Sequence, residues 1–551
     1  MPSLTLNREV VEKMIGKKLP DDKLKHDISY LGTDLEGIED NKIDVEIFPN
    51  RPDLLSEQGM GRALASFVGT KKGLKEFKMK PSGEKLIIKK QIKEWPHVVT
   101  AIVRGLTFSD EKIREIVQIQ EKLAVTFLRQ RGKGGIGLYP LDKIKFPVYW
   151  TANNPDKFKF RPLEFPKEIT GKQILSKHPT GREYGHICDG WKELPYFVDS
   201  DDKIMSMPPI INSHDMGKIT EDTKDVFVEA TGTDLRILKL ALNMIVAALY
   251  EMGGKVETME ISGPKNYTTP DFTPSEMKLD VADVNKLLGL ELDTKKVADN
   301  LEKMGYGIKK SNSKSLGVLI PAYRADILHP VDLIEDVAIA YGYDNFIPTI
   351  PEAATIGKES DKDIFVRKLS EIIVGLGITE VNSFIISPSD AETTKVLRDV
   401  ELIFLKNPST KEYDCVRPWL VSSMLTVLQM NKRHEYPQNI FLTGRCAQLI
   451  TKNPGYNEDD RISVALCGDN VTFTSIKQVL DHLMHQIGVE FSLEVVKDST
   501  FMEGRTGKII VDGTEVGIIG EINPEVLVNF ELEMPTAILE INIDILNRLK
   551  V

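Results

Sequence analysis

The pattern of apolar and polar residues predicts both strands and helices along the whole chain. From Ile43 to Ile47 apolar residues alternate with acidic ones, which is the period of a strand with one buried face. From Ile237 to Tyr250 the residues are almost all apolar, and only Lys239 and Asn243 interrupt them. This stretch is too short to span a bilayer, so it predicts a buried helix and no membrane association.

Because helices and strands are mixed throughout, we expect an α+β fold with several domains. A lysine-rich stretch at Lys71–Lys80 predicts a linker after the first of them. The four expected domains are a small N-terminal α/β unit (1–80), a second domain with polar strand ends (85–265), a winged-helix-like unit (268–346) and an antiparallel sheet with flanking helices (350–551). In the third domain we expect helices at 281–288 and 294–304, the second capped by Asp293.

Composition narrows the class of protein. The 551 residues are 41% hydrophobic and 28% charged, as in soluble globular proteins with full cores. The net charge of -11 argues against bulk electrostatic binding of nucleic acid, and no basic recognition helix points to DNA. The four cysteines form no CxxC pair and the N-terminus lacks a signal-peptide pattern, so we expect a cytoplasmic protein with reduced thiols.

Four acidic residues near a predicted helix at Pro330 are candidate metal ligands. Asp332, Glu335 and Asp336 stand at i, i+3 and i+4, so they share one helix face, and Asp326 lies just before the helix. Carboxylate oxygens of this kind suit Mg²⁺. The alternative is that acids in a first helical turn only complement the helix dipole. The residues alone leave both interpretations open.

A second candidate site combines two strand-like segments that end in small polar residues. Met207–Ser213 contains two prolines before its polar end, and Asp225–Asp234 leads into the apolar helix. Hydroxyl, amide and carboxylate groups at such ends can line a pocket that recognises a polar ligand. The alternative is plain capping of the next helix. The candidate pocket residues are Asn212, Ser213, Glu229, Thr231, Thr233 and Asp234.

For two further motifs we expect a structural role and no ligand-binding role. Arg51 and Asp53 lie between prolines, which favours a loop fastened by its own aspartate. The glycine-rich stretch Arg131–Gly137 lacks the GK[ST] ending of a phosphate loop and the spacing of a dinucleotide fingerprint, so we expect a solvated turn.

Several of these segments together resemble the β subunit of phenylalanyl-tRNA synthetase, in its archaeal and eukaryotic form. They are PNRPDLLS, PPIINS, TGTD and ADILHPVDLIEDVAIAYGYDN, in this order over nearly the full length. The resemblance implies an (αβ)2 heterotetramer with a catalytic α subunit, which joins L-phenylalanine to tRNA(Phe) using ATP. It implies that the four acids hold Mg²⁺ at the contact with α. It also implies that the second domain edits tyrosyl-tRNA and that the fourth is a class II synthetase fold without an active site.

The sequence of the fourth domain agrees with the absence of an active site for aminoacylation, which we call the synthetic site. A class II site needs an arginine on the ATP phosphates and an acidic partner. Between Glu380 and Val551 we find neither an Arg-x-Glu strand motif nor a glycine-rich segment ending in Glu-Arg. Where the family has a Phe-Glu-x-Gly-Asp-like strand, this chain reads Phe441-Leu442-Thr443-Gly444-Arg445-Cys446.

Two other classes of function remain open at this point. One is a purely structural or tRNA-binding subunit whose editing pocket is inactive. The other is a stand-alone Mg²⁺-dependent hydrolase built on Asp326–Asp336, which fits poorly because only His329 lies beside the acids.

Overall fold

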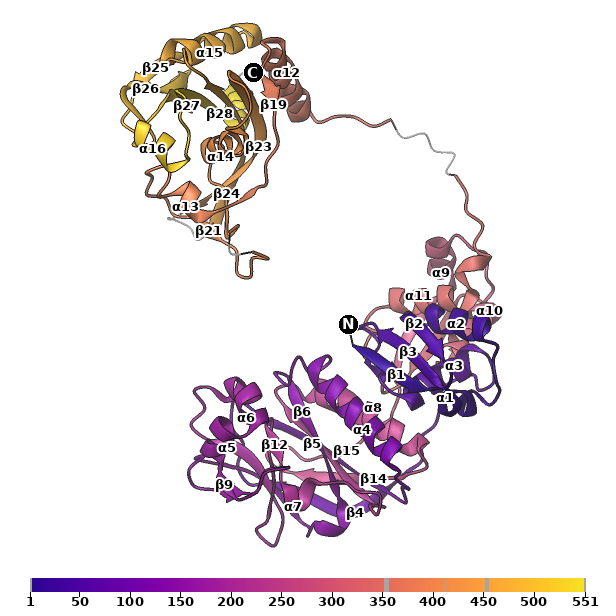
Figure 1. Cartoon of the computed structure of the whole chain (residues 1–551). Helices are drawn as coiled ribbons and strands as arrows, with labels where there is room; N and C mark the ends of the chain where they lie inside the picture. Colours follow the sequence, from indigo (N-terminus) through magenta and orange to yellow (C-terminus); the bar gives the residue numbers. More distant parts are fainter. Residues whose placement is uncertain (1, 351–355, 411, 451–454, 550–551) are drawn as a thin grey trace. The chain divides into compact units, whose positions relative to one another are not determined.

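A computed structural model describes residues 2–350, 356–410, 412–450 and 455–549. The chain divides into two compact units, residues 1–349 and 350–551 (Figure 1). Both contain helices and sheets, so the α+β class is confirmed. The finer division into four domains stays a prediction. In the described ranges, no helix is long and apolar enough to cross a membrane.

The first unit begins with a three-stranded antiparallel sheet in the order β1-β3-β2. The alternating segment is strand β3, and its three apolar side chains are fully buried. Arg51 donates from Nε and Nη2 to the two carboxylate oxygens of Asp53, at 2.9 and 2.8 Å. Both residues are buried, so the interpretation as a self-fastened loop is confirmed. The elements are β1 (Ser3–Asn7), α1 (Arg8–Ile15), α2 (Asp21–Tyr30), β2 (Thr33–Glu39), β3 (Lys42–Ile47), η1 (Pro52–Leu54) and α3 (Glu57–Phe67).

A ten-stranded sheet follows, in the order β12-β11-β10-β7-β4-β14-β5-β13-β6 with β15 beside β14. Helices α4 and α8 lie side by side against it, and α8 is the predicted apolar helix (Figure 1). Strand β4 begins within the expected linker. The strands are β4 (Met79–Ile88), β5 (His97–Arg104), β6 (Gly134–Pro140), β7 (Val148–Asn153), β10 (Leu194–Val198), β11 (Ile204–Met207), β12 (Ile211–Asn212), β13 (Val226–Gly232), β14 (Lys255–Ser262) and β15 (Tyr267–Thr269); the helices are α4 (Asp110–Val125) and α8 (Leu235–Glu251).

Smaller elements connect these strands and cover the ends of the sheet. They are η2 (Leu141–Lys143), β8 (Lys159–Phe160), β9 (Ile169–Thr170), α5 (Gly171–Lys177), α6 (Pro179–Tyr184), η3 (Gly185–Cys188) and α7 (His214–Gly217).

The expectation of a solvated glycine-rich turn is wrong. Its second half, from Gly134, is the start of β6, whose seven residues are all buried. Strand β6 pairs with β13 alone, so it forms one edge of the sheet, and α4 packs over it. The glycines allow this close packing because they carry no Cβ atom.

The last part of the first unit has the three predicted helices and a sheet in the order β16-β18-β17. Asp293 caps α10 by accepting a hydrogen bond from the backbone N of Lys296, at 2.7 Å, as expected. The sequence analysis did not anticipate strand β16. The elements are β16 (Ser275–Asp280), α9 (Val281–Leu288), α10 (Thr294–Lys303), β17 (Gly307–Ser311), β18 (Ser315–Ile320), α11 (Pro330–Tyr341) and η4 (Tyr343–Asn345).

The second unit is built on a seven-stranded sheet in the order β19-β23-β24-β28-β27-β26-β25, antiparallel except for the β19–β23 pair. Apolar residues of α12, α15 and α17 pack on one face, and those of α14 and α16 belong to a second core. An antiparallel sheet with flanking helices is what the sequence predicts for this part. The elements are α12 (Asp361–Gly375), β19 (Thr379–Glu380), β20 (Ile386–Ser387), α13 (Ser389–Glu392), β21 (Ile403–Phe404), β22 (Cys415–Val416), α14 (Val421–Asn431), β23 (Gln438–Ile450), β24 (Gly455–Cys467), α15 (Phe473–Ile487), β25 (Ser492–Val495), β26 (Phe501–Val511), β27 (Thr514–Ile522), α16 (Pro524–Asn529), β28 (Thr536–Asn542) and α17 (Ile543–Leu549).

Two glutamates face each other where α3 meets α4. Glu57 accepts a hydrogen bond from the backbone N of Asn7 at 2.8 Å, and Gln58 donates to Glu115 at 3.3 Å. The other carboxylate oxygen of Glu115 is buried and has no partner among the described residues. Burial, and then the charge of Glu57, raises the pKa of Glu115 to about 8.

We expect Glu115→Gln to stabilise the protein at high pH only. The folded chain keeps a proton on Glu115 that the unfolded chain releases near pH 4.5, so this residue's contribution to stability is lost as the pH rises from 4.5 to about 8. Glutamine stays neutral, so the variant should gain about 2–4 kcal/mol over the wild type at pH 8.5 and little at pH 4.5. Denaturant midpoints at both pH values measure this, with exposed Glu94→Gln as control. A gain that is the same at both pH values would contradict the prediction.

Candidate functional site

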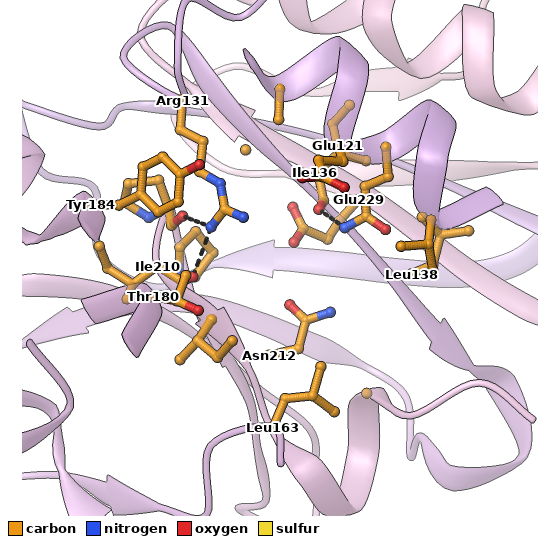
Figure 2. A pocket seen from close by; sticks show the side chains of 18 of the residues that line it. Glu121, Arg131, Ile136, Leu138, Leu163, Thr180, Tyr184, Ile210, Asn212 and Glu229 are labelled. Atoms are coloured by element: carbon orange, nitrogen blue, oxygen red, sulfur yellow. Dashed lines mark hydrogen bonds between the residues drawn. The ribbon is translucent and has the colours of Figure 1, made fainter. Parts of the chain in front are cut away.

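A cavity of about 570 Å³ lies where the two edge strands of the ten-stranded sheet approach each other (Figure 2). Asn212 on β12 lines it, and the hydroxyl of Tyr139 on β6, which is not itself a lining residue, donates to Oδ1 of Asn212 at 3.1 Å. Helix α4 supplies one wall, and Gln120 on this helix donates to the carbonyl of Ile136 at 2.5 Å. We call this space the edge cavity.

Glu229 on β13 is the buried acid of the edge cavity. Only 2% of it is exposed, and its Oε1 lies 3.1 Å from the hydroxyl of Tyr139. Its Oε2 is buried without a hydrogen-bond partner in the described part of the chain. Burial raises the pKa of Glu229 to about 8, so the side chain is mostly protonated at neutral pH.

Protonation of Glu229 gives a consistent hydrogen-bond chain. The single hydroxyl hydrogen of Tyr139 serves Asn212, while the carboxyl hydrogen of Glu229 is donated to the phenolic oxygen. This leaves Oε2 of Glu229 as an unused acceptor. A buried acceptor without a partner is costly unless a ligand completes it.

Gly137 makes room for this chain. A Cβ atom at Gly137 would lie 2.4 Å from Oε1 of Glu229 and 2.5 Å from the hydroxyl of Tyr139. At Gly135, two residues earlier on the same strand, an added Cβ would be in ordinary contact with Pro209, at 3.5 Å. Glycine is therefore required at 137 for the observed positions of both polar side chains.

Arg131 joins the two sides of the edge cavity. Its Nη1 donates to the carbonyl oxygens of Pro209 and Ile210, at 3.1 and 2.9 Å, and its guanidinium lies 4.1 Å from the ring centre of Tyr184 (Figure 2). Arginine side chains stack well on aromatic faces. These contacts connect the turn before β6 to the segment before β12, so they help to fix the width of the cavity.

The structure brings together two of the six predicted pocket residues, Asn212 and Glu229. Ser213 and Thr231 are buried but do not line the edge cavity, although the Thr231 hydroxyl is also buried without a partner. Thr233 is exposed and lies past the end of β13.

Asp234 also lies outside the edge cavity. Its Oδ1 accepts from the backbone N atoms of Arg236 and Ile237, at 2.9 and 3.3 Å, so it caps α8. Thr233 and Asp234 follow β13 and lie outside the edge cavity, and the six-residue pocket stays a prediction. Asp234 therefore has the alternative role given above, which is capping of the following helix.

Sequence reasoning missed most of the cavity wall. Arg131, which lines the cavity, lies in the stretch expected to be a solvated turn, and Tyr139, which contacts the lining residues Asn212 and Glu229, has no motif around it. The lining residues on α4, β6, β12 and β13 come from elements that lie far apart along the chain. The sequence feature that could have indicated the cavity is the pair of glycines at 135 and 137, because glycine within a strand often marks the close approach of another segment.

In the acidic motif, the guanidinium group of Arg324 is the cation that binds the carboxylates. It donates from Nε and Nη2 to Asp326, at 2.8 and 2.7 Å, and from Nη2 to Asp336, at 2.8 Å. Tyr306 also donates to Asp336. Asp332 Oδ2 accepts from the backbone N of His329 at 2.7 Å and completes a capping box at the start of α11.

Glu335 is the exposed member of the four acids. Partial burial, and then the charges of Asp336, Asp332 and Asp326, raises its pKa, so the four acids are close enough to repel one another. In the described ranges, however, no group of three or more His, Cys, Asp or Glu residues is placed to hold a metal ion. Because Arg324 and the helix cap already use three of the carboxylates, this arrangement does not fit Mg²⁺. The metal site stays a prediction.

Comparison with known proteins gives the family. A family model described as phenylalanyl tRNA synthetase beta chain CLM domain matches residues 347–543, and one described as tRNA synthetase B5 domain matches residues 277–343. The phenylalanine–tRNA ligase beta subunit of Pyrococcus furiosus is 37% identical, over 98% of this chain and 99% of its own length. That of Archaeoglobus fulgidus is 36% identical, over 98% of both chains.

A solved structure agrees with these relatives. The crystal structure of an N-terminal fragment of the phenylalanyl-tRNA synthetase beta-subunit from Pyrococcus horikoshii is 37% identical, covers 62% of this chain and 100% of its own length, and superposes with a TM-score of 0.60. With relatives of this identity over nearly the whole length, the chain belongs to the family of phenylalanine–tRNA ligase beta subunits.

Proposed function

We propose that this chain works in the cytoplasm with a catalytic α subunit, as an (αβ)2 heterotetramer that attaches L-phenylalanine to tRNA(Phe) using ATP. Its membership of the beta-subunit family supports this role. In the proposal, the chain supplies the scaffold and a hydrolytic editing site, and the α subunit carries the synthetic site.

The edge cavity is the proposed editing site, and the observation that carries this assignment is the unpartnered Oε2 of Glu229. Tyrosine differs from phenylalanine by one hydroxyl, which an apolar synthetic pocket rejects by only about a hundredfold. A tyrosyl group in the edge cavity would donate that hydroxyl to Oε2. A phenylalanyl group would leave the acceptor unpaired, so tyrosyl-tRNA is favoured.

The hydrolytic step uses water as the nucleophile. No serine, cysteine or histidine lines the edge cavity, so its lining residues offer no Ser–His or Cys–His pair for a covalent intermediate. Water attacks the ester carbonyl, the bond to the ribose oxygen breaks, and tyrosine and free tRNA leave. The cavity walls contribute by holding the ester in place beside that water.

The second unit supports the absence of a synthetic site in this chain. Phe441 and Leu442 are buried in its cores, and Arg445 forms an ion pair with Asp460 at 3.2 Å. Phe441 and Leu442 are apolar and buried, so neither offers a polar contact to ATP phosphates. The proposed catalytic site of aminoacylation therefore belongs to the partner.

We expect the isolated chain to show only background ATP–pyrophosphate exchange with phenylalanine, and exchange to appear when the α subunit is added. The reason is the missing arginine and acidic constellation between Glu380 and Val551. Exchange by the pure single chain would contradict the proposed division of labour.

A further inference from the structure

A second cavity, of about 210 Å³, lies in the first unit and shares no lining residue with the edge cavity. Its walls come from the loop of Arg51, from α3, from the stretch Lys71–Lys75, from the end of α8 and from the segment before α11. We call it the basic cavity.

The lining of the basic cavity carries six cationic side chains and two acidic ones. Two acids, Asp53 and Glu251, are part of its lining. Three further carboxylates pair with the cations from outside the lining: Asp299 with Lys72, and Asp326 and Asp336 with Arg324. The cationic lining residues are Arg51, Arg62, Lys71, Lys72, Lys75 and Arg324.

These pairs leave hydrogen-bond donors unused. Arg51 and Arg324 each donate from Nε and Nη2 to carboxylates, so neither Nη1 has an acceptor among the described residues. Arg62 donates to Glu251 alone, at 2.6 Å, and its guanidinium lies 4.1 Å from the ring centre of Tyr323. A guanidinium has five N–H donors, so most of those on Arg62 are free.

The three lysines of the lining add further donors. Lys71 donates only to the carbonyl of Met14, at 3.1 Å, and has no carboxylate partner in the described part of the chain. Lys72 and Lys75 each hold one carboxylate, at 2.6 Å. An ammonium group has three donors, so each lysine retains capacity for a further acceptor.

We propose that the basic cavity binds a small phosphate-type oxyanion. A tetrahedral oxyanion offers several acceptors close together, which matches the unused N–H groups of three arginines and the lysines. The volume is below the usual 300–1,000 Å³ of sites for drug-sized ligands, so a phosphate or pyrophosphate group fits better than a whole nucleotide. The group is either a free ion or part of an RNA backbone.

The test is titration of the full chain with inorganic phosphate and with pyrophosphate, followed by isothermal calorimetry. We expect saturable binding at one site. Lys71→Gln/Lys72→Gln should weaken it about tenfold, because two charged donors are lost. The matched control is Lys17→Gln/Lys18→Gln, an adjacent exposed pair outside the lining, which makes the same change in net charge and should keep the wild-type affinity.

A competition experiment separates the two sources of phosphate. If a 5′-phosphorylated RNA oligonucleotide binds and inorganic phosphate displaces it in the wild type, the cavity takes phosphate groups of RNA. If RNA does not bind while pyrophosphate does, the ligand is the free ion. No saturable uptake of either ion, or equal weakening in the two double variants, would overturn the proposal.

Discussion

Gly137→Ala should abolish hydrolysis of tyrosyl-tRNA by the complex of this chain with its α subunit, while phenylalanylation continues at its normal rate. The added Cβ would lie 2.4 Å from Oε1 of Glu229 and 2.5 Å from the hydroxyl of Tyr139, so both side chains must move. A displacement of about 1 Å in a positioned site costs about a hundredfold in rate. The measurement is the initial rate of deacylation of purified tyrosyl-tRNA.

Gly135→Ala, which adds a methyl group to the wall of the edge cavity without a steric clash, is the comparison variant for this experiment. It adds the same methyl group to the same strand, but the new atom would be 3.5 Å from Pro209, an ordinary contact. We expect it to retain most of the deacylation rate. An equal loss of deacylation rate in both variants would show that β6 tolerates no side chain for reasons unrelated to Glu229. Wild-type deacylation rates in both variants would show that Glu229 has no part in the proposed mechanism.

The second large effect is expected for Arg324→Met. The substitution leaves Asp326 and Asp336 without their cation, and Asp336 is only 5% exposed. Breaking a buried ion pair from one side costs about 3–5 kcal/mol, because a buried charge remains uncompensated. The free energy of unfolding, measured by denaturant titration of the isolated chain, gives the loss.

The control for Arg324→Met is Arg114→Met, which removes an exposed ion pair with Asp110 in the same unit. We expect a loss of no more than about 0.5 kcal/mol there. Adding Asp336→Asn to Arg324→Met should restore part of the stability, because the unpaired buried charge disappears. If Arg324→Met costs no more than the exposed control, the buried cluster does not depend on Arg324.

Elements set by local signals could be predicted from the sequence. The alternating segment at β3, the apolar helix α8 and the cap at Asp293 follow from side-chain period and capping chemistry, which act over a few residues. The fastening of Arg51 by Asp53 is likewise local, since a single residue, Pro52, separates the partners along the chain.

The candidate site depends on contacts between distant segments, so the sequence predicted only part of it. Asn212 and Glu229, which line the edge cavity, were among the candidates because both lie in segments expected to end in polar residues, although Glu229 is in the middle of β13. Tyr139 and Arg131 were not, because their roles arise when β6 and β12, from opposite ends of the sheet order, come together. Similarly, spacing alone placed three acids on one helix face with Asp326 just before the helix, but it did not show that Arg324 binds Asp326 and Asp336.

The rates at which the reconstituted complex hydrolyses tyrosyl-tRNA and phenylalanyl-tRNA, measured side by side, test the central claim most directly. We predict that tyrosyl-tRNA is hydrolysed about a hundredfold faster or more, and that Glu229→Ala brings the two rates together, because it removes the acceptor that distinguishes the two amino acids. Equal rates in the wild type, or a preference for tyrosyl-tRNA that survives Glu229→Ala, would contradict the account.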